Sequence, residues 1–165
     1  MLIPVIRSRA RRVPATELVP TNEGGEMGLV YADIELISGD DLALHRRGYI
    51  KEEEIKRLSV RALVDSGAYM LAISKRVKEQ LDLAVLNTQI SQLADGTTVE
   101  LEVAGPVEVR FANRRASVDA VVLPGDVEVL LGAIPMEEMD VLVDPKQERL
   151  ILNPAHPNMA QGVLK

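Results

Sequence analysis

An acidic residue that could do chemistry stands at the end of a short apolar segment, in Arg61-Ala-Leu-Val-Asp-Ser-Gly-Ala68. The segment has the composition of a buried β-strand, and the glycine after it allows a turn that a bulkier residue would strain. We therefore expect Asp65 to be held at the end of a rigid strand, in a tight loop whose backbone amides point at its carboxylate. Aspartate, serine and glycine are also the commonest turn formers, so an ordinary strand-to-turn aspartate is the alternative interpretation.

A second apolar strand, Val129-Leu-Leu-Gly132, also ends at a glycine and precedes a predicted short helix, Ala133–Met139. Together, Leu-Val-Asp-Ser-Gly-Ala and the later Val-Leu-Leu-Gly resemble the motifs of the retroviral-type (retropepsin-like) aspartic proteases of clan AA. The likeness is greatest to the small single-domain bacterial members, and it runs from about Met27 to Leu152. It implies a mostly β fold, a small closed β-barrel of the retropepsin-like acid protease type with one or two short helices.

The resemblance also implies a role for each motif residue. Asp65 would be catalytic, and its loop would be supported by Ser66, Gly67 and Ala68, with the Ser66 hydroxyl hydrogen-bonded across a pair of aspartates. The residues that would pack behind the loop, with the glycine letting two backbones approach closely, are Leu130, Leu131 and Gly132.

A two-residue turn signal, Asp95-Gly96, lies between two strand-like segments, residues 86–93 and 97–103, and this pattern predicts a β-hairpin. In the family that the motifs resemble, a hairpin at this place is the flap, a mobile cover over the bound peptide. An ordinary exposed hairpin is the alternative. The residues expected at the flap and against the substrate are Ala94, Asp95, Gly96 and Thr97.

Aspartic proteolysis needs two carboxylates that are close enough to share one proton. The chain has one Asp-Ser-Gly motif after an apolar strand, so the chemistry would require a homodimer, with Asp65 from each of two identical chains on the two-fold axis. An extended peptide or protein substrate would lie between this dyad and the flaps as an added strand. The mechanism would need no metal and no organic cofactor.

The chain departs from the retroviral pattern at two positions. Retroviral enzymes commonly carry an acid directly after the first motif and an arginine directly after the later glycine, and the two side chains pair near the substrate. Here those positions hold Tyr69 and Ala133. Both halves of the pair are replaced together, so retroviral specificity and dimer details are not carried over to this chain.

Composition limits the remaining possibilities. The chain has 165 residues, enough for one domain with a real core, and 47% of them are hydrophobic. A net charge of −6 argues against nucleic acid as the main partner. The chain has no cysteine, which suits a reducing cytoplasm. No apolar run approaches the roughly 18 residues of a membrane span, so we expect no membrane partner.

The domain organisation is expected to have three parts. Residues 1–26 are predicted to be a flexible lead-in, with Met27 as the hypothetical natural start, and residues 27–153 the protease-like domain. An inserted lobe is expected at about residues 39–58, with some helix around residues 51–57. Residues 154–165 are predicted to be an extended tail, in which His156 has no specific role.

Short strands separated by turn signals are typical of a small barrel or sandwich. We expect strands at residues 29–37, 69–73, 106–112, 115–123, 127–131, 140–143 and 148–152, and a helix that Ser74 caps at residues 75–81.

Three functions remain open at the level of sequence. The first is a homodimeric aspartic endopeptidase, and the second is a non-catalytic dimeric module on the same fold that binds peptides or a partner protein. The third is a small-ligand barrel that uses Asp65 as a lone acid, which a strictly monomeric protein would favour.

Overall fold

The computed structural model describes residues 28–92 and 95–162. The predicted lead-in and Ala94 lie outside these described residues. Among the described helices, none is long and apolar enough to cross a membrane.

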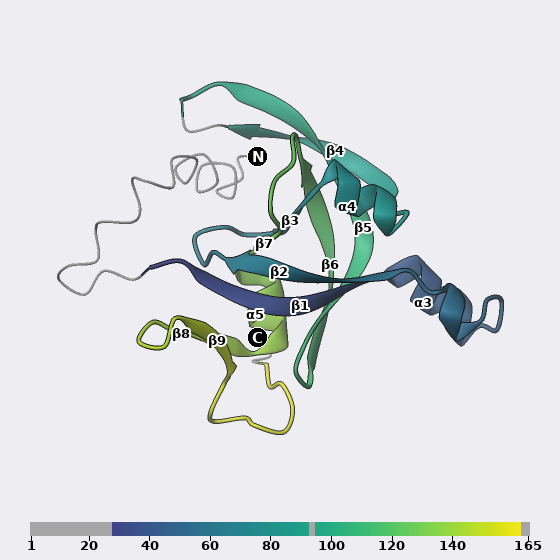
Figure 1. Cartoon of the computed structure of the whole chain (residues 1–165). Helices are drawn as coiled ribbons and strands as arrows, with labels where there is room; N and C mark the ends of the chain where they lie inside the picture. Colours follow the sequence, from purple (N-terminus) through teal and green to yellow (C-terminus); the bar gives the residue numbers. More distant parts are fainter. Residues whose placement is uncertain (1–27, 93–94, 163–165) are drawn as a thin grey trace.

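The described chain is mostly β, and the predicted fold class is confirmed (Figure 1). Seven strands form one sheet in the order β1-β2-β7-β3-β6-β5-β4, and β1 also pairs with β5, so that six of the strands close into a ring. A separate two-stranded sheet contains β8 and β9. The strands are β1 (Val30–Ser38), β2 (Arg57–Val64), β3 (Leu71–Ser74), β4 (Ala84–Gln92), β5 (Thr98–Phe111), β6 (Arg114–Leu123), β7 (Leu130–Leu131), β8 (Val141–Asp144) and β9 (Arg149–Leu152).

Three short α-helices occur in the described chain, where the sequence predicted one or two: α3 (Gly39–Arg46), α4 (Lys75–Gln80) and α5 (Ala133–Met139). Ser74 caps α4 as predicted, because its hydroxyl oxygen accepts a hydrogen bond from the Val77 N–H at 3.2 Å. A single 3-10 turn, η3, spans Glu52–Glu54.

The long strand β5 closes the ring because its two halves have different partners. Its first half pairs with β4, from Thr98 to Gly105, and its second half pairs with β1, from Val107 to Arg110. The register against β6 shifts between Ala104 and Val107, which bends the strand from one partner to the other.

The core is built almost wholly from aliphatic side chains, as the near absence of large aromatic residues requires. One cluster fills the ring, and a second cluster lies beneath the loop that contains Asp65. Burying each large aliphatic side chain stabilises the fold by about 1.5–3 kcal/mol. The second cluster consists of Leu63, Ala68, Ala72, Leu101, Val121, Leu123 and Leu130.

The connection between β1 and β2 places its helix earlier than the sequence predicted. The α-helix is α3, which starts where the Ser38 hydroxyl accepts a hydrogen bond from the Asp41 N–H at 3.2 Å. The residues expected to be helical form only η3, because the chain enters β2 at Arg57 and pairs with β1 from there. Asp41 accepts a hydrogen bond from the Lys56 N–H at 3.0 Å and ties the two ends of the connection together.

The residues after β9 also differ from the predicted extended tail, because they turn back onto the end of α5. Asp140 ends that helix with a left-handed backbone, and its carboxylate accepts hydrogen bonds from the Asn153 side chain and the Gln161 N–H, both at 3.0 Å. His156, to which the sequence assigned no role, has its Nδ1 2.7 Å from Asp140 Oδ2. One carboxylate with several lone pairs thus gathers the donors of the tail.

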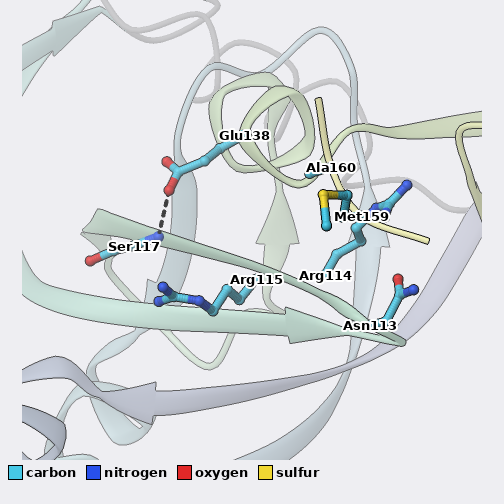
Figure 2. A pocket seen from close by; sticks show the side chains of 7 residues that line it. All are labelled: Asn113, Arg114, Arg115, Ser117, Glu138, Met159 and Ala160. Atoms are coloured by element: carbon cyan, nitrogen blue, oxygen red, sulfur yellow. Dashed lines mark hydrogen bonds between the residues drawn. The ribbon is translucent and has the colours of Figure 1, made fainter. Parts of the chain in front are cut away.

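Figure 2 shows a pocket of about 510 Å³ between β6, α5 and this tail. The tail is attached on this side too, because the Asn113 side chain donates to the Pro157 carbonyl at 3.2 Å and Arg114 donates to the His156 carbonyl. The pocket contains no residue of the Asp65 loop; its lining residues are Asn113, Arg114, Arg115, Ser117, Glu138, Met159 and Ala160.

The hydrogen bonds to Asp140 predict that the tail detaches in acid. Hydrogen bonds from the Asn153 side chain and the Gln161 N–H, with a further contribution from His156, lower the pKa of Asp140 from 3.8 to about 2. Because the pKa is lower in the folded state, the contacts stabilise the fold fully above about pH 4 and this stability is lost as pH falls through about 2. We expect the Gln161 amide resonance to move over that range as the tail detaches.

The matched control is Asp140→Asn, since asparagine tolerates a left-handed backbone and keeps an acceptor oxygen but does not titrate. In this variant the Gln161 resonance should not follow the acid transition. An identical transition in both proteins would show that Asp140 is not the group that titrates.

Candidate active site

Asp65 is positioned by the end of β2, which pairs in parallel with β7. The Leu63 N–H donates to the Val129 carbonyl at 2.8 Å, and the Asp65 N–H donates to the Leu131 carbonyl at 3.0 Å. Leu63 and Leu131 are fully buried, so these bonds are shielded from water. The backbone of Asp65 is therefore fixed by a strand that lies far from it in the sequence.

The loop after β2 directs its own amides toward the aspartate. The Gly67 N–H donates to Asp65 Oδ1 at 3.0 Å, and the Ala68 N–H donates to the Asp65 carbonyl at 3.0 Å. Asp65 is half-buried, Ser66 and Gly67 are exposed, and Ala68 is fully buried. The carboxylate is thus held on one oxygen and remains accessible on the loop.

Gly67 does not serve the purpose that the sequence suggested for it. Four glycines of the described chain have a positive φ, at positions 48, 96, 105 and 125, and Gly67 is not one of them. The close approach of two backbones predicted at Gly132 is confirmed. A Cβ atom there would lie 2.4 Å from the Met70 carbonyl oxygen and 2.7 Å from the Tyr69 carbonyl carbon.

This close approach joins the Asp65 loop to the start of α5. Directly after Gly132, the Ala133 N–H donates to the Ala68 carbonyl at 2.7 Å, and the Ile134 N–H donates to the Tyr69 carbonyl at 2.8 Å. The first free amides of the helix are therefore satisfied by the loop itself. The structure brings together the two sequence motifs, residues 65–68 and 130–132, in one hydrogen-bonded unit.

Two apolar side chains flank this unit and remain open to solvent. Tyr69 is 49% exposed and Ile134 is 47% exposed. The sequence drew attention to Tyr69 and Ala133, but it missed Ile134. No local pattern indicates its exposure, which follows from how α5 packs against the loop.

The predicted hairpin is present as β4 and β5, and its tip is stabilised locally. Asp95 Oδ1 accepts hydrogen bonds from the Thr97 hydroxyl at 2.7 Å and the Thr97 N–H at 2.9 Å. These bonds, the hydroxyl first, lower the pKa of Asp95. Gly96 has a φ of 92°, which only glycine adopts without strain in a turn of this kind.

The hairpin and the Asp65 loop lie at the same end of the molecule, opposite α3 (Figure 1). The hairpin contacts the loop segment through Gln89 of β4, whose side-chain amide donates to the Met70 sulfur at 3.7 Å. Within the described chain, the residues of the hairpin tip make no hydrogen bond with Asp65. No cluster of three His, Cys, Asp or Glu side chains that could hold a metal ion was found in residues 28–92 and 95–162.

The close approach at Gly132 makes a second prediction. Gly132→Ala should destabilise the fold by about 1–3 kcal/mol, because the new methyl group meets backbone atoms that cannot rotate away. Urea unfolding measures the loss. Gly162→Ala is the matched control, since a Cβ at Gly162 has no atom within 4 Å. Equal stability of the two variants would show that the loop and α5 are not held as closely as described.

One similar solved structure is the retroviral protease-like domain of Ddi1 from Leishmania major, with a TM-score of 0.49, 18% sequence identity, and coverage of 78% of this chain and 91% of that chain. The curated proteins gave no match. The model of the family described as Aspartyl protease matches residues 52–134, just over half of the chain, and these residues include both motifs and the hairpin. The chain therefore belongs to the aspartyl protease family.

Proposed function

We propose that the protein is a homodimeric aspartic endopeptidase in which Asp65 from each of two chains forms the catalytic dyad. The observation that supports this most directly is the accessible Asp65 carboxylate, fixed by the Gly67 amide and by the bond from its own N–H to Leu131. Family membership supports the reaction class. A single such aspartate in each chain requires a second chain to complete the pair.

In the proposed mechanism the two carboxyl groups hold one proton between them. The ionised carboxylate takes a proton from a water molecule, whose oxygen attacks the peptide carbonyl carbon, while the protonated carboxyl donates its proton to the carbonyl oxygen. The tetrahedral diol then collapses as the C–N bond breaks: the amine nitrogen receives a proton from the protonated carboxyl, and the other carboxylate takes a proton from one of the diol's hydroxyl groups. The products are a carboxylic acid and an amine, and the dyad again holds one proton.

The residues around Asp65 would divide the remaining work. Ser66 is exposed on the loop, so its hydroxyl is free to bond across the two-fold axis. Ala68 and the buried pair Leu130 and Leu131 would keep the loop rigid from behind. An extended peptide would lie between the two loops and the two hairpins. The hairpin tips, with Asp95, Gly96 and Thr97, would cover the peptide.

The dyad makes a third prediction. Asp65→Asn should lower the rate of peptide cleavage by about a hundredfold to ten-thousandfold, because asparagine cannot take or give the proton. Cleavage of a mixed peptide library measures the rate, and an unchanged circular dichroism spectrum and dimer mass show that the fold is retained. The matched control is Asp126→Asn, an exposed aspartate that pairs only with Arg76. An active Asp65→Asn protein would refute the dyad.

Mixed dimers test whether the site is shared. When wild-type and Asp65→Asn chains are combined in equal amounts and allowed to exchange, only the pure wild-type dimers should cleave. Activity should then fall to roughly a quarter of that of the same total amount of wild type. A fall to about half, proportional to the wild-type chains, would show instead that each chain works alone.

The fourth prediction concerns pH. Because one carboxyl of the pair must keep its proton, cleavage should be fastest in acid and should decline toward neutral pH. Rates measured from about pH 4 to about pH 9 test this, with the dimer mass followed in the same buffers. A rate that still rises above about pH 8 would contradict a shared proton.

The same library distinguishes the second candidate function, a non-catalytic dimer that binds peptides. The exposed Tyr69 and Ile134 beside the loop are the observation that favours it, since they offer an apolar contact surface that needs no chemistry. A folded dimer that binds library peptides but cuts none would support this alternative.

A further inference from the structure

Strand β4 differs from the other strands of the seven-stranded sheet because it has a partner on one side only. It pairs with β5, while the remaining six strands close into the ring. A strand at the edge of a sheet presents unpaired N–H and carbonyl groups and is a template for another strand. β4 offers nine residues, Ala84–Gln92, for such pairing.

Proteins usually protect edge strands with charged residues, proline or short length. β4 has none of these protections, since its sequence Ala-Val-Leu-Asn-Thr-Gln-Ile-Ser-Gln contains neither a charge nor a proline. Its exposed apolar residues include Leu86 (48% exposed) and Ile90 (47% exposed). Among the described strands, none pairs with the outer edge of β4, and the strand carries no feature that would prevent another strand from pairing there.

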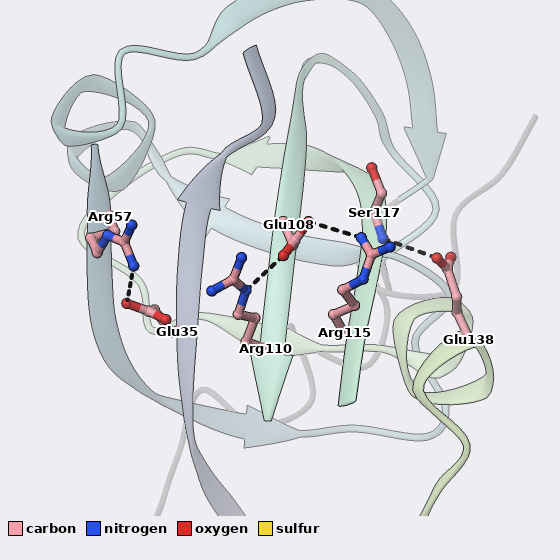
Figure 3. Close-up of polar contacts among 7 residues, drawn as sticks. All are labelled: Glu35, Arg57, Glu108, Arg110, Arg115, Ser117 and Glu138. Atoms are coloured by element: carbon pink, nitrogen blue, oxygen red, sulfur yellow. Dashed lines mark hydrogen bonds and ion pairs between the residues drawn. The ribbon is translucent and has the colours of Figure 1, made fainter. Parts of the chain in front are cut away.

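The strands of the ring provide the contrast. Their outer faces carry ion pairs, such as Arg57 with Glu35 and both Arg110 and Arg115 with Glu108 (Figure 3). The two-stranded sheet has short edges of four residues, and each of them contains a charged residue, Asp144 in β8 and Arg149 in β9. Only β4 combines length with the absence of charge among the described strands.

We propose that β4 is a self-association surface that pairs, antiparallel, with β4 of a second copy of this chain. The two-fold axis passes through Thr88, the middle residue of the strand, so that the whole of β4 overlaps its copy. In this register Thr88 faces Thr88 of the copy, and Ile90 faces Leu86 of the copy on both sides of the axis. The half-exposed apolar side chains thereby cover each other.

The sequence of β4 favours a second copy as the occupant, because Leu86 and Ile90 lie two residues on either side of Thr88 and so meet each other across a two-fold axis. Charge permits this contact. Two chains with a net charge of −6 repel each other over most of their surface, and an uncharged strand is where that repulsion is least. The nearest acids on the same face, Glu100 and Glu102, lie on β5, one strand away from the contact. Glu102 is also paired with Lys78 at 2.9 Å. The opposing strands therefore bring no like charges directly together.

This contact does not use the Asp65 loop, so it is separate from the proposed catalytic dimer. Its axis lies on β4, whereas the dyad axis would lie between two Asp65 loops. A chain that makes both contacts would assemble beyond a dimer. A chain that makes only the β4 contact would form a dimer whether or not it is a protease.

The chain contains no cysteine, so single cysteine substitutions report directly on the register. Opposing residues of antiparallel strands have Cα atoms about 4.5–5.5 Å apart, which a disulfide can span. Under mild oxidation of the full chain, Thr88→Cys should form a covalent dimer. Ile90→Cys alone should not, because its own copy lies four residues away along the strand. A mixture of Leu86→Cys and Ile90→Cys should form the mixed dimer.

A second measurement does not depend on disulfides. Leu86→Glu places a carboxylate against the apolar Ile90 of the copy and adds like charge to two acidic chains, so it should weaken the association by about tenfold or more. Sedimentation over a range of concentrations should show that the largest wild-type assembly halves in mass. Leu86 is 48% exposed, so this substitution should leave the unfolding midpoint unchanged.

The outcomes separate the possibilities clearly. A covalent Thr88→Cys dimer, with halved mass for Leu86→Glu, supports the proposal. Equal cross-linking of all the cysteine variants, or of Ile90→Cys alone, would refute the register and the two-fold axis. No cross-linking, with the same mass for wild type and Leu86→Glu, would show that a second copy does not occupy β4. Loss of peptide cleavage in Asp65→Asn, by contrast, bears only on the proposed protease.

Discussion

The position of Asp65 depends on the insertion of a two-residue strand, β7, between β2 and β3. Leu130 and Leu131 pair in parallel with Leu63 and Val64, and Leu130 also pairs with Ala72 of β3. This strand supplies the carbonyl that receives the Asp65 N–H. A buried amide without such a partner costs about 1–3 kcal/mol, so the loop has no comparable alternative position. Gly132 then lets the next residues turn directly under the loop.

The ring of strands explains why so short a strand is sufficient. Because β1 pairs with both β2 and β5, the sheet is closed around the first core cluster, and β2 and β3 cannot separate to release β7. β5 also continues past the ring to carry β4. One long strand thus belongs to the rigid part of the fold along one half and to the hairpin along the other.

Much of this arrangement could be predicted from the sequence, because local patterns and a distant motif pointed the same way. The Asp95-Gly96 turn, the Ser74 cap and the helix after Gly132 are set by neighbouring residues, and each is in place. The motifs placed residues 65–68 beside residues 130–132. The reason given for Gly67 was wrong, however, since its backbone has no positive φ and the steric demand falls on Gly132.

The predictions that were wrong share one cause: the structure there depends on contacts between residues that lie far apart in the sequence. The helix expected after Lys51 yields to β2, because pairing with β1 satisfies the backbone from Arg57 onward. The tail turns back because Asp140 presents acceptors to Asn153, His156 and Gln161. No local pattern around residues 154–162 contains that information. Ile134 was missed for the same reason, since its exposure follows from how α5 packs beneath the loop.

The pairing of β2 with β7 also sets the order in which the molecule can mature. The aspartate leaves the ribosome long before Leu130 and Leu131, and its loop has no partner for its backbone until they arrive. Contacts between such distant segments form late, after the intervening chain has closed the loop between them. A growing chain therefore carries the acidic motif without its β7 partner while the residues between Asp65 and Leu131 are made. The loop that holds Asp65 therefore reaches its final geometry only when nearly the whole ring has been made.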